Sequence, residues 1–339
     1  MFTRLLKTSL LAAAAVGALT GGASAQTLKF AFVFPQSHWL WVHGGEIFAK
    51  AVEEGTGGAV TFTPFPSGQL GKETVSAIES GLAETGIVVP SYEPAKLPLT
   101  SVFELPGFHS TACEGTAKAW NLLQPGGAVY EAEFKPQGLV PLYVNVLAPY
   151  QLVTTSKKIE TIDDVAGLKI RANGTAQDKT ARAIGAVPVT VTTTEFYDSM
   201  TRGTVDGGLW PIGSTKQGGL ETVIHHTVRG PQLGGGVTVF AVGERVWDRL
   251  DDATKQVMRD AGQKTQAQLC EYLDAQEIAV VDDLVAAGSL EVVDLPPAEK
   301  ERWAERVATV GEDWANELDS TGRPGTDILN AYREAPTGL

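Results

Sequence analysis

The first third of the chain alternates between strand-like apolar runs and stretches with helical spacing. Residues 28–34 (LKFAFVF) are rich in β-forming side chains and end at a proline, which predicts a first strand. Apolar positions recur at helical spacing over residues 39–54, and a glycine-rich turn ends that segment. Residues 60–65 predict a second strand, 71–81 a helix and 86–89 a short third strand. This β-α-β-α-β order indicates an α/β unit with a largely parallel sheet.

A second unit with the same alternation occupies residues 150–236. Its predicted strands are 151–155, 168–172, 187–191 and 208–211, and its predicted helical segments are 161–165, 177–184 and 194–202. A strand at 140–147 precedes it, and a strand at 237–242 returns the chain to the first unit. Residues 251–284 contain no proline and predict one or two long helices, 297–318 predict another, and the tail after Gly322 is expected to be irregular.

These elements predict a bilobed α/β protein whose two lobes are joined by strand-like crossings and a hinge. Lobe I is expected to contain residues 26–149 and about 237–275, and lobe II residues 150–236 and about 276–339. In such a fold the ligand lies in the cleft at the carboxyl ends of the strands, and the lobes close around it.

The first 25 residues have the pattern of an export signal. Arg4 and Lys7 precede an apolar run at residues 10–19, and Ala23-Ser24-Ala25 is a small-residue cleavage site. The run is shorter than the roughly 20 apolar residues that span a bilayer, so a membrane anchor is disfavoured. We therefore predict cleavage after Ala25, a periplasmic location, and no membrane insertion of the mature chain.

The composition and net charge of the chain limit the classes of molecule that it is expected to bind. With 43% hydrophobic and 20% charged residues the chain is globular, and its formal net charge of -13 becomes -15 when Arg4 and Lys7 are removed. Such an acidic chain disfavours nucleic acid and anionic membranes as partners. Cys113 and Cys270 lack the spacing of a zinc site. An exported protein is permitted a disulfide, but we expect both cysteines to be unpaired and structural.

Motifs for catalysis or cofactor binding are incomplete. Residues 68–73 (GQLGKE) superficially resemble a phosphate-binding loop, yet they lack its first glycine and its hydroxyl residue. No GxSxG segment is present, and the five histidines do not have the spacing of a helical zinc pair. We expect no metal, no cofactor and no enzymatic activity, while a periplasmic α/β hydrolase or isomerase stays open as an alternative.

One basic residue stands at a position suited to ligand binding. Arg171 ends the predicted strand 168–172 in the second lobe, where its side chain is expected to face the cleft. Its planar guanidinium matches a carboxylate through two parallel hydrogen bonds. A surface arginine is the alternative interpretation of the pattern alone.

Several segments resemble the DctP-type substrate-binding proteins of TRAP (tripartite ATP-independent periplasmic) transporters. They occur in the order of that family: 48–54 (FAKAVEE), 65–71 (FPSGQLG), 103–106 (FELP), 167–171 (GLKIR), 185–189 (GAVPV), 195–197 (EFY), 203–207 (GTVDG) and 247–250 (WDRL). The resemblance implies a periplasmic-binding-protein-like fold with two α/β lobes and a long bracing helix in the C-terminal third, a solute carboxylate paired with Arg171, and delivery to a membrane permease. We expect the protein to be a monomer. A binding protein that feeds a sensor kinase fits the same segments.

Departures from the family pattern suggest the class of ligand. Trp210 stands where the family commonly has asparagine, Phe34 ends the first strand, and Tyr150-Gln151 replaces a second arginine. An arginine among apolar neighbours suits a monocarboxylate with an apolar or aromatic body, because a sugar acid or dicarboxylate leaves polar groups unpaired. We expect hydrogen bonds from Tyr150, Gln151 and Tyr197, and further aromatic contacts from Trp39 and Tyr92.

Overall fold

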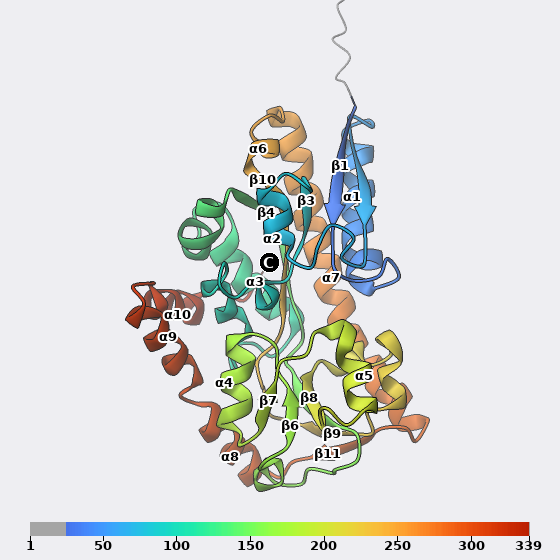
Figure 1. Ribbon diagram of the computed structural model, residues 1–339, viewed down its shortest axis with the longest axis vertical. Coiled ribbons are helices and arrows are strands. Elements are labelled where there is room, and N and C mark those ends of the chain that lie inside the picture. The colour runs from blue at the N-terminus through green and yellow to red at the C-terminus, as the bar shows by residue number, and fades with distance from the viewer. Residues whose placement is uncertain (1–24, 339) are drawn as a thin grey trace, which may run out of the picture.

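The computed structural model describes residues 25–338, so residues 1–24 of the predicted export signal lie outside the described part. Figure 1 shows two lobes stacked along the long axis of the molecule, with helix α7 (Asp252–Ala286) running alongside both. Each lobe contains one mixed sheet covered by helices, which confirms the predicted bilobed α/β class. No helix among residues 25–338 combines the length and apolarity needed to cross a membrane.

The sheet of the first lobe has the order β2-β1-β3-β10-β4. β1 pairs in parallel with β2 and β3, whereas β10 is antiparallel to β3 and β4. The strands are β1 (Gln26–Ala31), β2 (Val60–Phe65), β3 (Thr85–Val88), β4 (Leu139–Val146) and β10 (Val237–Gly243). β4 and β10 are buried along their whole length, and β4 is buried although it is an edge strand because α3 and α7 pack against it.

Helices of the first lobe cover both faces of this sheet. The segment predicted as one helix at 39–54 is a π-helical turn, η1 (Leu40–Gly45), followed by α1 (Glu46–Gly55). The others are α2 (Thr74–Glu79), the 3-10 helices η2 (Pro90–Tyr92) and η3 (Leu99–Glu104), α3 (Ala112–Leu123) and α6 (Glu244–Trp247).

The second lobe has a six-stranded sheet with the order β11-β9-β5-β8-β6-β7. Its strands are β5 (Gln151–Thr154), β6 (Lys169–Arg171), β7 (Val187–Val189), β8 (Gly207–Trp210), β9 (His226–Arg229) and β11 (Glu291–Asp294). The flanking helical segments are η6 (Ile162–Val165), α4 (Thr175–Ala183), η7 (Thr193–Glu195), α5 (Phe196–Thr201), η8 (Ile212–Ser214) and α8 (Pro297–Val307). β6 lies between β7 and β8 and is parallel to both, so the carboxyl ends of these three strands meet at one edge.

The last two helices return to the first lobe. Val310 and Trp314 of α9 (Val310–Ser320) and Tyr332 of α10 (Gly325–Glu334) are buried in the core that contains Leu97 and Phe103. The expected division instead placed all of residues 276–339 in the second lobe. The prediction of an irregular tail is also wrong, because α10 begins directly after Pro324 and buries apolar side chains one helical turn apart.

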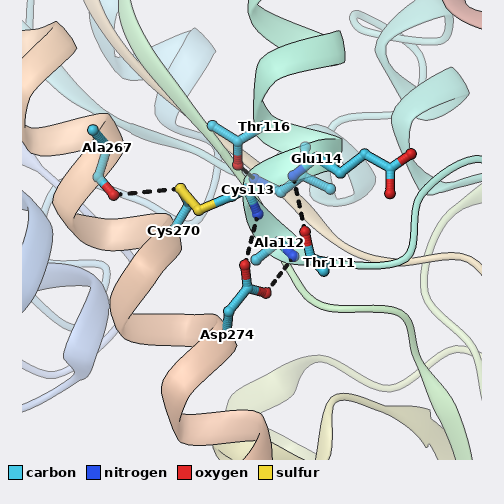
Figure 2. The surroundings of a disulfide bond; sticks show 9 residues. Thr111, Ala112, Cys113, Glu114, Thr116, Ala267, Cys270 and Asp274 are labelled. Carbon is cyan, nitrogen blue, oxygen red and sulfur yellow. Dashed lines mark hydrogen bonds between the residues drawn. A yellow bond between two sulfur atoms is a disulfide. The ribbon is translucent and has the colours of Figure 1, made fainter. Parts of the chain in front are cut away.

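A disulfide joins Cys113, in the first turn of α3, to Cys270 in α7, with 4.7 Å between their Cα atoms. The expectation that both cysteines are unpaired is therefore wrong. Figure 2 shows the reason: α7 passes beside the amino end of α3, and Asp274 accepts hydrogen bonds from the backbone N–H groups of Ala112 (2.6 Å) and Cys113 (3.1 Å). Thr111 caps the same helix by accepting from the N–H of Glu114.

One helical turn beyond Asp274, α7 is also fixed to the second lobe. The Glu277 carboxylate accepts hydrogen bonds from the N–H groups of Ile212 (3.1 Å) and Gly213 (2.7 Å) at the start of η8. Gly213 lies so close to α7 that a Cβ atom there would come within 2.8 Å of the Glu277 nitrogen. The single long helix therefore contacts both lobes through two neighbouring carboxylates.

Candidate functional site

Arg171 lies at the carboxyl end of β6, where the parallel strands of the second lobe meet the first lobe. Its side chain is only 2% exposed. β8 can approach this strand closely because position 208 is glycine: a Cβ atom there would come within 2.6 Å of the Phe196 ring and 3.2 Å of the Arg171 Cβ. The glycine pair that follows Asp206 thus permits the packing that encloses the arginine.

Protein groups hold the Arg171 guanidinium but use only part of its hydrogen-bonding capacity. Nε donates to the Val191 carbonyl (3.1 Å), one terminal nitrogen to the Leu209 carbonyl (3.3 Å) and the other to the Thr193 hydroxyl (3.3 Å). These bonds use three of its five N–H donors and leave two for a ligand. The ion pairs within residues 25–338 do not include Arg171.

Two aromatic rings enclose the guanidinium. Its central carbon lies 5.3 Å from the ring centre of Trp210 and 5.5 Å from that of Phe196. Both distances fall within the range of cation–π attraction, which is strongest where water is excluded. The rings therefore pack against a buried positive charge that forms no ion pair within residues 25–338.

A cavity of about 290 Å³ lies in front of Arg171, between the two lobes. Seven of the eight predicted site residues line it: Phe34, Trp39, Tyr92, Tyr150, Arg171, Tyr197 and Trp210. Gln151 does not, because its side chain points away from the cavity and is hydrogen-bonded to Glu277 and Thr227. Gln151 is the first residue of β5 and directly follows Tyr150, and successive side chains of an extended chain face opposite sides.

The first lobe contributes an aromatic wall. Phe34 stacks on His38 with 4.4 Å between their ring centres, and His38 Nδ1 accepts a hydrogen bond from the N–H of Leu40. Burial lowers the pKa of His38 to about 3, so its ring is neutral and adds no charge to the cavity. Tyr92 reaches across to the second lobe, where its hydroxyl accepts from the N–H of Thr193 (3.0 Å).

Five buried polar atoms on this cavity make no hydrogen bond within the described residues. They are Trp39 Nε1, Glu104 Oε2, Asn173 Nδ2, Trp210 Nε1 and Thr238 Oγ1. Buried polar groups are normally hydrogen-bonded, so their concentration around one cavity indicates a site for a polar ligand. The wall is thus less apolar than the sequence suggested.

The sequence analysis did not select Glu104, Asn173 and Thr238. Glu104 lies in the FELP segment, and Asn173 directly follows the predicted strand 168–172 that contains Arg171. Both residues therefore lie in or beside segments that the sequence analysis had already singled out. Among residues 25–338 no cluster of three or more His, Cys, Asp or Glu side chains is arranged to hold a metal ion.

Comparison with known families identifies the chain. The model of the DctP family, described as bacterial extracellular solute-binding protein, family 7, matches residues 33–317. The chain belongs to this family. The resemblance seen in the segments above is thereby confirmed, and the established activity of the family is solute binding.

Solved structures of family members share the fold. A TRAP solute-binding protein from Rhodoferax ferrireducens, in complex with copurified benzoate, has a TM-score of 0.81 at 21% identity, covering 91% of this chain and 96% of that one. One from Bordetella bronchiseptica with bound mandelate has a TM-score of 0.80 at 24% identity, covering 91% and 98%. The C4-dicarboxylate-binding periplasmic protein DctP of Rhodobacter capsulatus is 24% identical over 306 residues, 86% of either chain.

Proposed function

We propose that this DctP-family protein is a periplasmic receptor that holds a small organic monocarboxylate between its lobes and delivers it to a TRAP membrane permease. The observation that carries the proposal is Arg171. It is a buried guanidinium with no ion-pair partner among the described residues, and two of its N–H donors remain free beside a cavity. A buried charge without a partner is costly, and a ligand carboxylate would supply that partner.

The lining of the cavity favours one carboxylate over two. Arg171 is the only lysine or arginine among the described residues that line it, so a second carboxylate would be buried without a cation. Phe34 and Trp210 provide apolar surface for the body of the ligand, and the hydroxyls of Tyr150 and Tyr197 lie on the same lining. The benzoate and mandelate complexes of solved relatives agree with this class of ligand.

The remaining parts of the proposal concern location and delivery. The predicted signal at residues 1–25 supports export and cleavage after Ala25. The two lobes already touch at Tyr92 and Thr193, so a ligand in the cavity would be enclosed between them. We propose that the mature protein acts as a monomer that presents this closed form to the permease, without chemical change to the solute.

The test is a binding screen with a matched pair of arginine variants. Isothermal titration calorimetry and thermal shift would compare benzoate, mandelate, phenylacetate, pyroglutamate, succinate and galacturonate. We expect a monocarboxylate to bind best and Arg171→Lys to weaken it at least tenfold, because lysine lacks the planar fork. Arg202→Lys, on the exposed end of α5, is the matched control and should bind like the wild type.

Two outcomes would contradict the proposal. If no acid in the panel binds, the receptor function fails. If succinate binds best and Arg171→Lys binds it as well as the wild type, the assignment of both the anchor and the ligand class is wrong.

A further inference from the structure

Glu104 is a buried carboxyl group in the ligand cavity that none of the interactions described so far uses. It is the last residue of η3 and is 1% exposed. Its backbone carbonyl accepts from the N–H of Gly235 (3.2 Å), in the segment that crosses back from the second lobe to β10. The carboxyl is therefore held at the junction of the two lobes.

The carboxyl group lies near the backbone N–H of Val237, the first residue of β10, which favours its ionised form. Its Oε2 atom is buried and makes no hydrogen bond within residues 25–338. It faces Gly174, where a Cβ atom would lie 3.5 Å away, and Gly174 follows Asn173, whose side-chain amide also lacks a partner. An unpaired oxygen so placed is available to a molecule in the cavity.

The charged and titratable groups around Glu104 come from several elements. Arg171 on β6 and Tyr150, just before β5, lie near enough to Glu104 to affect its charge. Tyr92 of η2 lies near Tyr150, and Glu93, which follows η2, accepts a hydrogen bond from the amino end of α2. β10 contributes the uncharged Val237 and Thr238. The charged side chains of the other packed helices point outward: Asp178, Lys179 and Arg182 of α4, and Asp327, Arg333 and Glu334 of α10.

Burial affects the pKa of Glu104 more strongly than the attraction to Arg171 does. Loss of hydration raises the pKa of Glu104 to about 8, although Arg171 and the Val237 N–H both act to lower it. Tyr150 remains a neutral phenol, since burial raises its pKa far above the ordinary value. Glu104 is thus mostly a neutral carboxylic acid at pH 7, with a hydrogen that Oε2 can donate.

We propose that Glu104 is a specificity-determining residue that binds the ligand as a neutral carboxylic acid and so links ligand binding to a proton. This inference rests on the proposed capture of a carboxylate by Arg171. A ligand carboxylate in the same small cavity disfavours a second negative charge, as in sites where two carboxyls share a proton. The protonated Glu104 instead donates to an oxygen of the ligand. Above its pKa, binding must take up one proton from solution.

The experiment measures binding against pH by isothermal titration calorimetry. The ligand is the tightest-binding of the five monocarboxylates named above, none of which titrates between pH 6 and 10. For the wild type we expect a nearly constant association constant from pH 6 to 7 and a fall approaching tenfold per pH unit above pH 8. Repeating pH 9 in two buffers of different ionisation enthalpy should show uptake of nearly one proton per ligand, against almost none at pH 6.

Two variants separate Glu104 from its neighbours. Glu104→Gln, which cannot titrate, should lose both the fall above pH 8 and the proton uptake, whatever its affinity at pH 7. Tyr150→Phe removes the neighbouring phenol and should keep both. A flat wild-type profile without proton uptake, or a Glu104→Gln protein that retains the fall, would overturn the role of Glu104 while leaving the receptor function intact. Failure of all six acids to bind would overturn the receptor function itself, and this inference with it.

Discussion

Breaking the Cys113–Cys270 disulfide should lower the thermal stability substantially. The two cysteines are 157 positions apart, so the bond closes a very long loop. The chain-entropy relation gives about 5 kcal/mol for a loop of this length at 25 °C. With an unfolding entropy of about 2.1 cal/mol/K per residue over about 310 residues, this corresponds to a decrease in Tm of about 8 °C.

The assay compares calorimetric melting of the oxidised wild type, the reduced wild type and Cys113→Ala/Cys270→Ala. Reduced wild type isolates the cross-link, because its side chains are otherwise unchanged. The double variant should melt close to the reduced protein and should not respond to a reductant. Titration of thiols in denaturant should find none in the untreated wild type. A reduced protein that melts within about 2 °C of the oxidised one would refute the argument from loop entropy.

Two further predictions concern carboxyl groups. Glu277→Ala leaves two backbone donors of η8 unsatisfied, so we expect a loss of about 3 kcal/mol in denaturant unfolding, with the exposed Glu271→Ala on the same helix as the nearly neutral control. Desolvation raises the pKa of Glu104 to about 8 and those of Glu133 and Glu277 to about 7. Because these values exceed those of the unfolded chain, the folded state binds more protons, and Tm should rise as the pH falls from 8 to 6.5; a falling Tm would contradict the assigned shifts.

The sequence allowed the core of the site to be predicted because its signals are local. Arg171 ends a short strand, and alternation along that strand together with the position of the strand in the second lobe placed its side chain toward the cleft. Trp210, the last residue of β8, and Phe34, three residues beyond the end of β1, were selected instead because they depart from the pattern of the family that the segments resemble. The error at Gln151 arises because one position along a strand reverses the direction of a side chain, and the sequence did not fix which residue faced the cavity.

Features that depend on distant segments were not predictable in this way. Glu104 has a surface-type side chain, and it is buried only because residues 234–237 cross over it. The disulfide required the position of α3, a helix that the sequence analysis did not identify, relative to the middle of α7. Helix α10, by contrast, could have been predicted locally, because Ile328 and Tyr332 are four positions apart and so lie on one face of a helix. The sequence analysis gave more weight to the glycines and prolines around them.

The contacts between the lobes differ in strength, and this difference indicates where the cavity opens. Asp274 and Glu277 of α7 accept four backbone hydrogen bonds, two from each lobe. Across the cavity the lobes are joined by the Tyr92–Thr193 hydrogen bond and an exposed ion pair between Lys72 and Glu195 at 3.7 Å. Helix α4 of the second lobe also joins them, because its Ala176 is buried in the core of the first lobe and its Lys179 pairs with Glu317 of α9. An exposed ion pair contributes less than about 1 kcal/mol. The edge at Lys72 and Glu195 is therefore joined more weakly than the edges at α7 and α4, so we expect the cavity to open at that edge while those two helices keep the lobes attached.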